Sequence, residues 1–437
     1  MNESLQGKRI AYLTAGAAGM YCGSCMRDNA LAAELIRQGV DITLLPLYTP
    51  IRTDEESVAV EKVFFGGLNV FLQQKVPLFR HLPGFLDRWL DRPSVIKRLT
   101  SKAVEVAPKE LGALTLSMVK GESGFQRKEV RRLVEFLRDE VRPDLICLTN
   151  LLVGGSIPAI KRALPGVPIL VTLQGDDVFL DELIEPFQSQ VITEMKALAK
   201  EADGFITFTD HYANVMSEMM EIPREKFHLA VLGLDTAPFA GFSVSPSSRQ
   251  TIGYFARLSP EKGFDLMVDA FLQLHQRGKG PRLIAGGWLS AKDRNFFEQQ
   301  QQRIRAAGLD ASFDYLGSPD LEEKLQFFRD IDVFSVPARF TEPKGLYALE
   351  AMAAGVAIVE PDHGAFPEMI AASGGGSTFE RGNADALADA LARYLEDPTL
   401  RISHATQGQQ WVLNQSDRRA MADSSSAIFA SFLKRAG

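Results

Sequence analysis

Cysteine is scarce in this chain, with three among 437 residues. So few cysteines exclude a disulfide framework and fit a reducing compartment. Apolar runs long enough to span a bilayer are also lacking. The N-terminal residues as far as Leu13 resemble the first strand of a fold rather than a signal peptide, so we expect a cytoplasmic protein.

An excess of positive charge is missing as well. The chain carries 48 Lys and Arg against 55 Asp and Glu, a net charge of -7. Because general nucleic-acid binders neutralise phosphates with surplus basic side chains, this balance argues against nucleic acid as a partner. The composition, 46% hydrophobic and 24% charged, is that of a globular protein, and the length favours two or three domains.

Short apolar segments alternate with amphipathic ones in two stretches of the chain, a pattern typical of parallel sheets built from βαβ crossovers. In the first stretch we expect strands at residues 9–13, 41–45, 145–148, 169–172 and 204–208. In the second we expect strands at residues 251–255, 282–285, 313–316, 333–336 and 357–359. The pattern predicts an α/β fold of two Rossmann-like, doubly wound domains that face each other across a cleft.

A polar segment that contains Pro246 and several serines, residues 239–250, is interpreted as the linker. We therefore place one domain at 1–238 and a second at 239–414. Residues 415–437 have a helical pattern and are expected to pack back across both lobes.

Two carboxylates, Glu342 and Glu350, flank a predicted helix start at Gly345 and Leu346. The free N–H groups and the positive dipole end of such a start suit an anion such as a diphosphate. Glu342 precedes the helix, where it can meet a sugar, and Glu350 lies about one and a half turns into it, where it can accept hydrogen bonds from hydroxyl groups. A surface helix with two solvated acids is the alternative.

Five segments of the second half resemble, in order, the donor-binding domain of family 4 glycosyltransferases, which have the GT-B fold. They are residues 253–263, 315–317, 332–337, 342–355 and 364–368. The first half matches less tightly. Cys22-Gly23 stands where the family usually has Gly-Gly before its first long helix, and Gln174 stands where many members have a histidine. Residues 340–346 also resemble starch and glycogen synthases, although Met20 takes the place of their usual lysine.

The resemblance implies a retaining glycosyltransferase with an N-terminal acceptor-side domain and a C-terminal nucleotide-sugar-binding domain. A nucleotide-diphosphate sugar would be the co-substrate, with no metal and no other cofactor, and the departing phosphate would take the acceptor proton. The expected catalytic residues, which orient and stabilise the sugar, are Glu342, Asp177 and Gln174. The expected donor-binding residues are Gly23, Arg257, Lys262, Gly345, Leu346, Tyr347 and Glu350.

Arg257 and Lys262 follow the predicted strand 251–255 by a short loop, so both can reach the crevice at its C-terminal end. Cations aimed at the diphosphate stabilise it as a leaving group without a metal. The Asp-x-Asp spacing at residues 330–332 enters a strand at the opposite end, away from that crevice. A solvated loop in which the cations pair with Glu261 is the alternative.

Two departures leave other functions open. Cys22 and Cys25 form a Cys-x-x-Cys at a helix start, where redox chemistry can arise, although a second pair for zinc is missing. Gln174 can still form hydrogen bonds but cannot change its charge near neutral pH. Its presence leaves three interpretations open: an active enzyme that needs no titrating group here, an enzyme with a different donor, or a weakened enzyme. The alternatives are therefore an α-glucan synthase and a nucleotide-sugar-binding scaffold without turnover.

The acceptor is left open: a saccharide, a lipid-linked or a small-molecule acceptor. Residues 75–142 carry 15 Lys and Arg against 9 Asp and Glu. Such an excess suits an anionic acceptor or a peripheral contact with the inner face of a membrane. Helices with solvated basic faces are the alternative.

Overall fold

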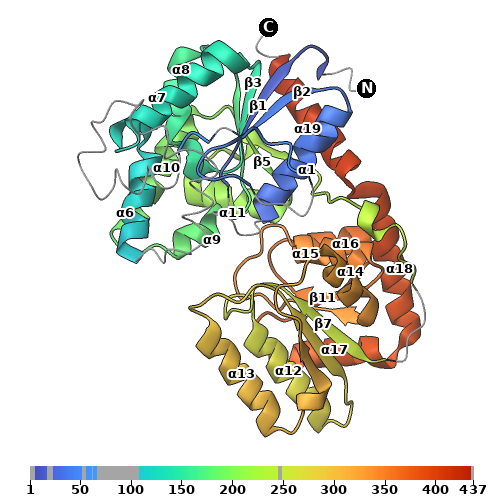
Figure 1. Cartoon of the computed structure of the whole chain (residues 1–437). Coiled ribbons are helices and arrows are strands. Elements are labelled where there is room, and N and C mark those ends of the chain that lie inside the picture. Colours follow the sequence, from blue (N-terminus) through green and yellow to red (C-terminus); the bar gives the residue numbers. More distant parts are fainter. Residues whose placement is uncertain are drawn as a thin grey trace. The chain divides into compact units, whose positions relative to one another are not determined.

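The computed structural model describes residues 5–16, 23–51, 56–61, 63–65, 108–244 and 249–434. Residues 75–107 of the basic stretch 75–142, together with Met20 and Cys22, lie outside these residues. The chain divides into unit 1, which comprises Met1–Val231 and Met421–Gly437, and unit 2, Leu232–Ala420. Each unit contains a six-stranded sheet flanked by helices (Figure 1). Within the described residues, no helix is both long and apolar enough to cross a membrane.

The sheet of unit 1 has the strand order β2-β1-β3-β4-β5-β6, and all its pairings are parallel. The strands are β1 (Arg9–Thr14), β2 (Asp41–Pro46), β3 (Leu145–Leu148), β4 (Ile169–Thr172), β5 (Gly204–Thr207) and β6 (Phe227–Leu229). The five strands predicted in this half are confirmed. The sixth, β6, was missed because three residues with His228 at the centre carry too weak an apolar signal.

The sheet of unit 2 has the order β12-β11-β10-β7-β8-β9 and is also parallel. Its strands are β7 (Thr251–Phe255), β8 (Arg282–Gly286), β9 (Phe313–Tyr315), β10 (Val333–Phe334), β11 (Ala357–Pro361) and β12 (Gly376–Phe379). The prediction of residues 333–336 as a strand was too long. Pairing ends early because the Val336 N–H group points to the Glu360 carboxyl group, at 3.3 and 3.4 Å from its two oxygens.

Helices connect the strands in both units. Those before the linker are α1 (Gly23–Arg37), α6 (Pro108–Val119), α7 (Arg127–Phe136), α8 (Ile157–Ala163), α9 (Asp176–Asp181), α10 (Phe187–Glu201) and α11 (Asp210–Met220). Those after it are α12 (Phe264–Gln276), α13 (Arg294–Ala306), α14 (Leu321–Asp330), α15 (Leu346–Ala353), α16 (Phe366–Ser373), α17 (Ala384–Glu396), α18 (Pro398–Gln415) and α19 (Arg418–Leu433).

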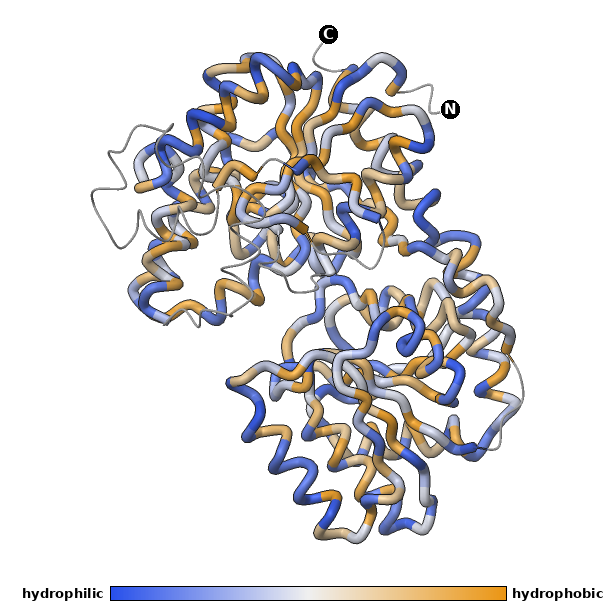
Figure 2. Tube along the Cα trace, viewed as in Figure 1, coloured by the Kyte–Doolittle hydropathy of each residue, from blue (hydrophilic) through white to orange (hydrophobic). Residues whose placement is uncertain are grey.

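Strand alternation divides the interior of unit 1 into two cores. Along β1, Ala11 and Leu13 belong to one core and Ile10 and Tyr12 to the other, because successive side chains of a strand point to opposite faces. The first core is covered by helices α6 to α11, and the second by α1 and α19. The apolar residues follow the strands in Figure 2.

The helix expected over residues 415–437 is present as α19, and a separate helix, α18, comes before it. Helix α18 ends at Gln415, and Ser416 and Asp417 separate it from α19. Asp417 forms a parallel bridge with Leu234, whose N–H group donates to the Ser416 carbonyl at 3.1 Å. Backbone pairing within unit 2 therefore holds together the two places where the chain passes between the units.

Helix α19 is anchored to the sheet of unit 1 by Phe432. A Cβ atom at Gly204, the first residue of β5, would lie 2.5 Å from the tip of the Phe432 ring, so this close approach requires glycine. The ring also packs edge-on against His228 at 5.1 Å. Burial of a phenyl ring at this depth makes the last helix part of the core of unit 1.

We therefore expect Phe432→Ala to destabilise unit 1 by about 3–5 kcal/mol, since it removes a buried ring and leaves a cavity. Denaturant unfolding followed by circular dichroism measures the loss. Lys434→Ala, at an exposed position two residues further on, is the control and should change little. Equal stability of the two variants would show that α19 is not part of the core.

Candidate functional site

The buried side chain of Tyr254 fixes the loop after β7. The Tyr254 hydroxyl lies 2.9 Å from the carbonyl oxygen of Arg257 and 3.3 Å from that of Lys262, so it bridges the two ends of the loop. Gly263 closes the loop with φ of +69°, and a Cβ atom there would lie 1.9 Å from the Pro337 carbonyl oxygen. Only glycine fits at this position. The closed loop places both predicted cations, Arg257 and Lys262, at the C-terminal end of the sheet.

Lys262 and Glu342 form a buried ion pair at this end of the sheet. The Lys262 Nζ atom donates to Glu342 Oε2 at 2.6 Å and lies over the rings of Phe340 and Tyr347, at 4.6 and 4.8 Å from their centroids. The Tyr347 hydroxyl also donates to Oε2 at 3.2 Å, and the Gly345 N–H group approaches Oε1 at 3.4 Å. Lys262 thus pairs with Glu342, and not with Glu261 as the alternative interpretation had it.

Burial and neighbouring charges shift the pKa values of two buried acids, Glu342 of this pair and Glu360 nearby. Burial alone would raise the pKa of Glu342, but the ammonium groups of Lys262 and Lys344 hold it below its usual value. Glu360, on β11, is fully buried, and burial raises its pKa well above the usual value. These shifts favour the charged form of Glu342 and the neutral form of Glu360.

Helix α15 starts beside this ion pair. Gly345 is its N-cap with φ of +71°, and a Cβ atom there would lie 2.7 Å from the Phe366 ring, so a glycine is required. The N–H groups of Leu346 and Tyr347 are in the first turn, where no intrahelical acceptor exists. Four predicted residues, Lys262, Glu342, Gly345 and Tyr347, therefore contact one another around a helix start suited to an anion.

Glu350 lies further along α15 and is held by a lysine that sequence reasoning missed. The Lys324 Nζ atom, on α14, donates to Glu350 Oε1 at 2.9 Å, and both side chains are largely buried. The sequence spacing indicated that Lys324 faces inward, because it shares a helix face with Leu321 and Phe328, a face on which an apolar residue is usual.

In unit 1, Gln174 follows β4 and turns its side chain into a buried polar cluster. Its Nε2 atom donates to the carbonyl and the hydroxyl oxygens of Thr149, at 3.0 and 2.9 Å, and lies 3.4 Å from Asp28 Oδ1. The Asp28 carboxylate also accepts hydrogen bonds from the hydroxyl groups of Tyr12 and Thr14, each at 2.9 Å. The amide of Gln174 is thus used within unit 1 itself.

The next residues of this loop are fixed by Tyr212 on α11. The Tyr212 hydroxyl accepts from the N–H groups of Gly175 and Asp176, at 2.9 and 3.1 Å, and donates to Asp177 Oδ1 at 2.7 Å. Burial raises the pKa of Asp177. Sequence reasoning missed Tyr212, which holds three consecutive residues of the predicted sugar-side loop.

Gly23, the cysteine pair and the Asp-x-Asp segment are the other groups that the sequence singled out. Gly23 begins α1 and is exposed. Cys25 is buried, while its potential partner Cys22 lies outside the described residues. Asp330 and Asp332 bind different arginines, Arg249 and Arg401. Among the described residues, no group of three or more His, Cys, Asp or Glu is arranged to hold a metal ion.

Comparison with known proteins identifies the second half of the chain. Residues 239–411 match the family described as Glycosyl transferases group 1. A lipopolysaccharide core biosynthesis mannosyltransferase, LpcC from Rhizobium leguminosarum bv. viciae, is 27% identical over 54% of this chain and 67% of its own length. The mannosyltransferase LpsB from Rhizobium meliloti is 31% identical over 40% of this chain, and the match covers less than half (46%) of LpsB.

The fold of the whole chain resembles that of a sucrose-phosphate synthase from Thermosynechococcus elongatus. The TM-score is 0.71 at 16% identity, and the superposition covers 98% of this chain and 100% of that one. Residues 239–411 therefore form a group 1 glycosyltransferase domain, and the predicted resemblance and the GT-B fold of two Rossmann-like units are confirmed.

Asp176 gives the site a pH signature that can be measured. Burial raises its pKa from 3.8 to about 7, against the N–H groups of Leu151 and Gln174 that favour its charged form. Because the folded state holds this proton more tightly, the resulting stabilisation is complete below about pH 4 and is lost as the pH rises through about 7.

We therefore expect Asp176→Asn, which cannot ionise, to reduce the loss of stability between about pH 4 and about pH 7. The free energy of unfolding of unit 1, measured in urea across this range, tests the expectation. Asp181→Asn, an exposed carboxylate at the other end of α9, should leave the wild-type pH dependence intact. Parallel curves for Asp176→Asn and wild type would contradict the assignment.

Proposed function

We propose that the protein is a retaining, metal-independent glycosyltransferase that takes its sugar from a nucleotide-diphosphate sugar. The cluster of Lys262, Glu342, Gly345 and Tyr347 at the start of α15 carries the proposal. It combines a cation and a charged carboxylate in direct contact with a helix start, where the first N–H groups have no intrahelical acceptor. This set suits a diphosphate with a sugar attached to it.

Each residue of unit 2 then has a role. Lys262, with Arg257 from the same loop and the N–H groups of Leu346, would hold the diphosphate as negative charge develops on it. Glu350, positioned by its pair with Lys324, would accept hydrogen bonds from the ribose hydroxyls. Such a site stabilises the leaving group with fixed charges.

Glu342 would hold the sugar, and Gln174 and Asp177 would help to orient it. In the proposed reaction the bond between the anomeric carbon and the diphosphate oxygen breaks. The acceptor hydroxyl then bonds to that carbon from the same face, and its proton passes to the departing phosphate. None of the three side chains serves as a nucleophile.

Lys262 has one feature that bears on affinity: it is already paired with Glu342 in the structure. A diphosphate must share or displace this pair, so donor binding would release Glu342 toward the sugar. The cost of separating the pair is offset by contacts of Lys262 with two phosphate groups.

The relatives that match include mannosyltransferases, so the donor panel that tests the proposal begins with GDP-mannose and extends to UDP- and ADP-sugars. We expect one of them to raise the thermal midpoint and to release nucleotide slowly in water and faster with an acceptor mixture. Saccharides, lipid-linked acceptors and small molecules make up that mixture, and vesicles test the membrane contact proposed for residues 75–142.

A scaffold without turnover is the second candidate, because Gln174 replaces a histidine and its amide is occupied by Thr149 and Asp28. Binding of a nucleotide sugar with no release of nucleotide under any condition would favour it. Elongation of a glucan primer would favour the α-glucan synthase instead.

A variant tests the diphosphate site directly. Lys262→Ala should weaken binding of the matching nucleoside diphosphate by about tenfold or more, because it removes a charge-assisted contact, and should leave the free nucleoside nearly unaffected. Titration calorimetry measures both. Lys279→Ala, which removes a surface lysine paired with Glu396, is the control. Equal losses for both ligands would remove the role given to Lys262.

A further inference from the structure

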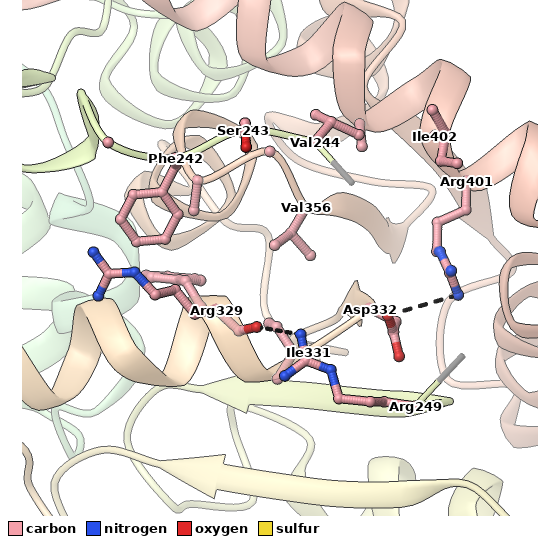
Figure 3. Close-up of a pocket in the computed structure, with 15 residues that line it drawn as sticks. Phe242, Ser243, Val244, Arg249, Arg329, Ile331, Asp332, Val356, Arg401 and Ile402 are labelled. Carbon is pink, nitrogen blue, oxygen red and sulfur yellow. Dashed lines mark hydrogen bonds and ion pairs between the residues drawn. The ribbon is translucent and has the colours of Figure 1, made fainter. Parts of the chain in front are cut away.

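Arginine side chains join separate segments of unit 2 at both ends of its sheet. Just before β7, Arg249 donates to Asp330 Oδ1 at 3.0 Å and to the Arg329 carbonyl oxygen at 2.7 Å. Figure 3 shows the contact with Arg329 in a pocket that also contains the ion pair of Arg401 and Asp332. Arg249 thereby ties the end of the linker to the end of α14, because one guanidinium group can donate to a carboxylate and a carbonyl group together.

At the C-terminal ends of the strands, Arg339 makes contacts of the same kind with the loop after β7. Its Nη1 and Nη2 atoms donate to the two carboxylate oxygens of Asp265, at the start of α12, each at 2.8 Å. Nη1 also donates to the Pro260 carbonyl oxygen at 3.2 Å. The Arg339 N–H group donates to the Glu261 carbonyl oxygen at 2.8 Å. Arg339 therefore binds this loop on both sides of Lys262.

The ion pair of Lys262 and Glu342 depends on the relative position of two loops. Lys262 belongs to the loop that Arg339 contacts, and Glu342 follows Arg339 within the same short segment after β10. The contact of 2.6 Å between Nζ and Oε2 therefore spans two loops that Arg339 joins directly. Tyr254 holds the ends of the first loop, whereas Arg339 ties that loop to the segment that carries the carboxylate.

Backbone contacts fix this segment from its other side. Arg381, which follows β12, donates to the Arg339 carbonyl oxygen, and the Ala365 N–H group donates to that of Glu342 at 2.8 Å. A Cβ atom at Gly364 would lie 2.6 Å from the Glu342 carbonyl oxygen, so the backbone after β11 approaches closely. Because the segment is held in this way, a change in the Arg339 side chain should displace mainly the loop that carries Lys262.

The exposure of the Arg339 contact indicates what it contributes. The Arg339 side chain is 43% exposed and that of Asp265 is 26% exposed. Ion pairs this close to solvent add little to the free energy of unfolding. A bidentate pair nevertheless fixes distance and orientation. The contact is therefore better suited to positioning a loop than to stabilising the unit, and its variants should keep the fold.

We propose that Arg339 is a positioning residue for the diphosphate: it sets Lys262 against Glu342 and holds the ammonium group where the diphosphate binds. Charge that is already in place favours binding because the ligand does not have to order it. Arg339 touches neither nucleotide nor sugar in this role and acts through Lys262. Its effect on the ion pair needs no ligand, whereas its effect on the diphosphate rests on the proposed function.

The first experiment measures the position of Lys262 without a ligand. An N-hydroxysuccinimide ester acylates the lysines of the full-length protein, and mass spectrometry gives the rate at each one. Lys262 is 12% exposed and paired, so it reacts only when its loop opens. Arg339→Ala should raise its rate by about two- to fivefold, as expected for loss of a partly exposed ion pair. Lys324, 9% exposed and paired with Glu350, is the internal reference and should keep its rate.

Two matched variants locate the effect. Arg249→Ala removes an exposed arginine with the same kind of contacts at the opposite end of the sheet, and Lys262 should react in it as in wild type. Asp265→Ala should raise the rate as Arg339→Ala does. Asp269→Ala, on the next turn of α12, removes a carboxylate paired with an arginine of α13 and should not.

The labelling rates decide the positioning role. Unchanged rates at Lys262 in Arg339→Ala and Asp265→Ala would overturn it. Equal increases in these variants and in Arg249→Ala would also overturn it, because they would show general loosening of unit 2 rather than a contact specific to this loop.

The second experiment separates positioning from charge. It measures by calorimetry the affinity for the nucleoside diphosphate, GDP, UDP or ADP, that binds the wild-type protein. Asp265→Ala removes a negative charge near the anion site, so charge alone predicts tighter binding, whereas positioning predicts binding weaker by about two- to fivefold. Arg339→Lys keeps the charge without the planar fork and should also bind more weakly. Tighter binding by Asp265→Ala, or wild-type affinity in Arg339→Lys, would overturn the proposal.

A double variant tests whether Arg339 acts through Lys262. Once Lys262 is replaced by alanine, Arg339→Ala should cause no further loss of diphosphate affinity, because no ammonium group is left to position. Additive losses would contradict the proposal. Failure of every nucleotide to bind wild type would count against the proposed function, and the labelling rates would then decide the role of Arg339 by themselves.

Discussion

The buried pair of Lys262 and Glu342 is the interaction around which unit 2 is arranged. Removing two charges from water is costly, and the structure offsets that cost with direct contact at 2.6 Å, two aromatic rings over the ammonium group and a tyrosine hydroxyl on the carboxylate. The pair joins the loop after β7 to the loop before α15, so it fixes the position of both. A change that breaks it leaves one charge buried without compensation.

Glu360 is a second buried acid close to this pair. Burial favours the neutral form of Glu360 by raising its pKa, and its carboxyl group accepts the Val336 N–H group. The same contact ends strand β10 after two residues and lets the chain turn toward Glu342. The contact made by one buried acid therefore shapes the backbone next to the Lys262–Glu342 pair.

Sequence patterns predicted the features that recur along the chain, such as strands and motifs. They did not predict features that depend on one contact between residues far apart in the sequence. Ten strands followed from apolar periodicity, and the cations and carboxylates of unit 2 from motif spacing. Lys324 and Tyr212 could not be assigned a partner, because Glu350 and Asp177 are 26 and 35 residues away and on other elements. Their sequence signal was only a polar group on a face that packs inward, which shows burial but not the partner.

The position of Gln174 explains how a departure from the family pattern fits the protein that surrounds it. Asp28 already receives hydrogen bonds from Tyr12 and Thr14 and lies 3.2 Å from the Arg27 guanidinium, so this interior holds a balanced pair of charges. A histidine beside this carboxylate would be drawn toward its charged form and would add a buried positive charge. A glutamine amide supplies the donor to Thr149 without a charge. The substitution therefore fits the polar cluster beside the loop, and in the proposed reaction Asp177 and Glu342 would contact the sugar.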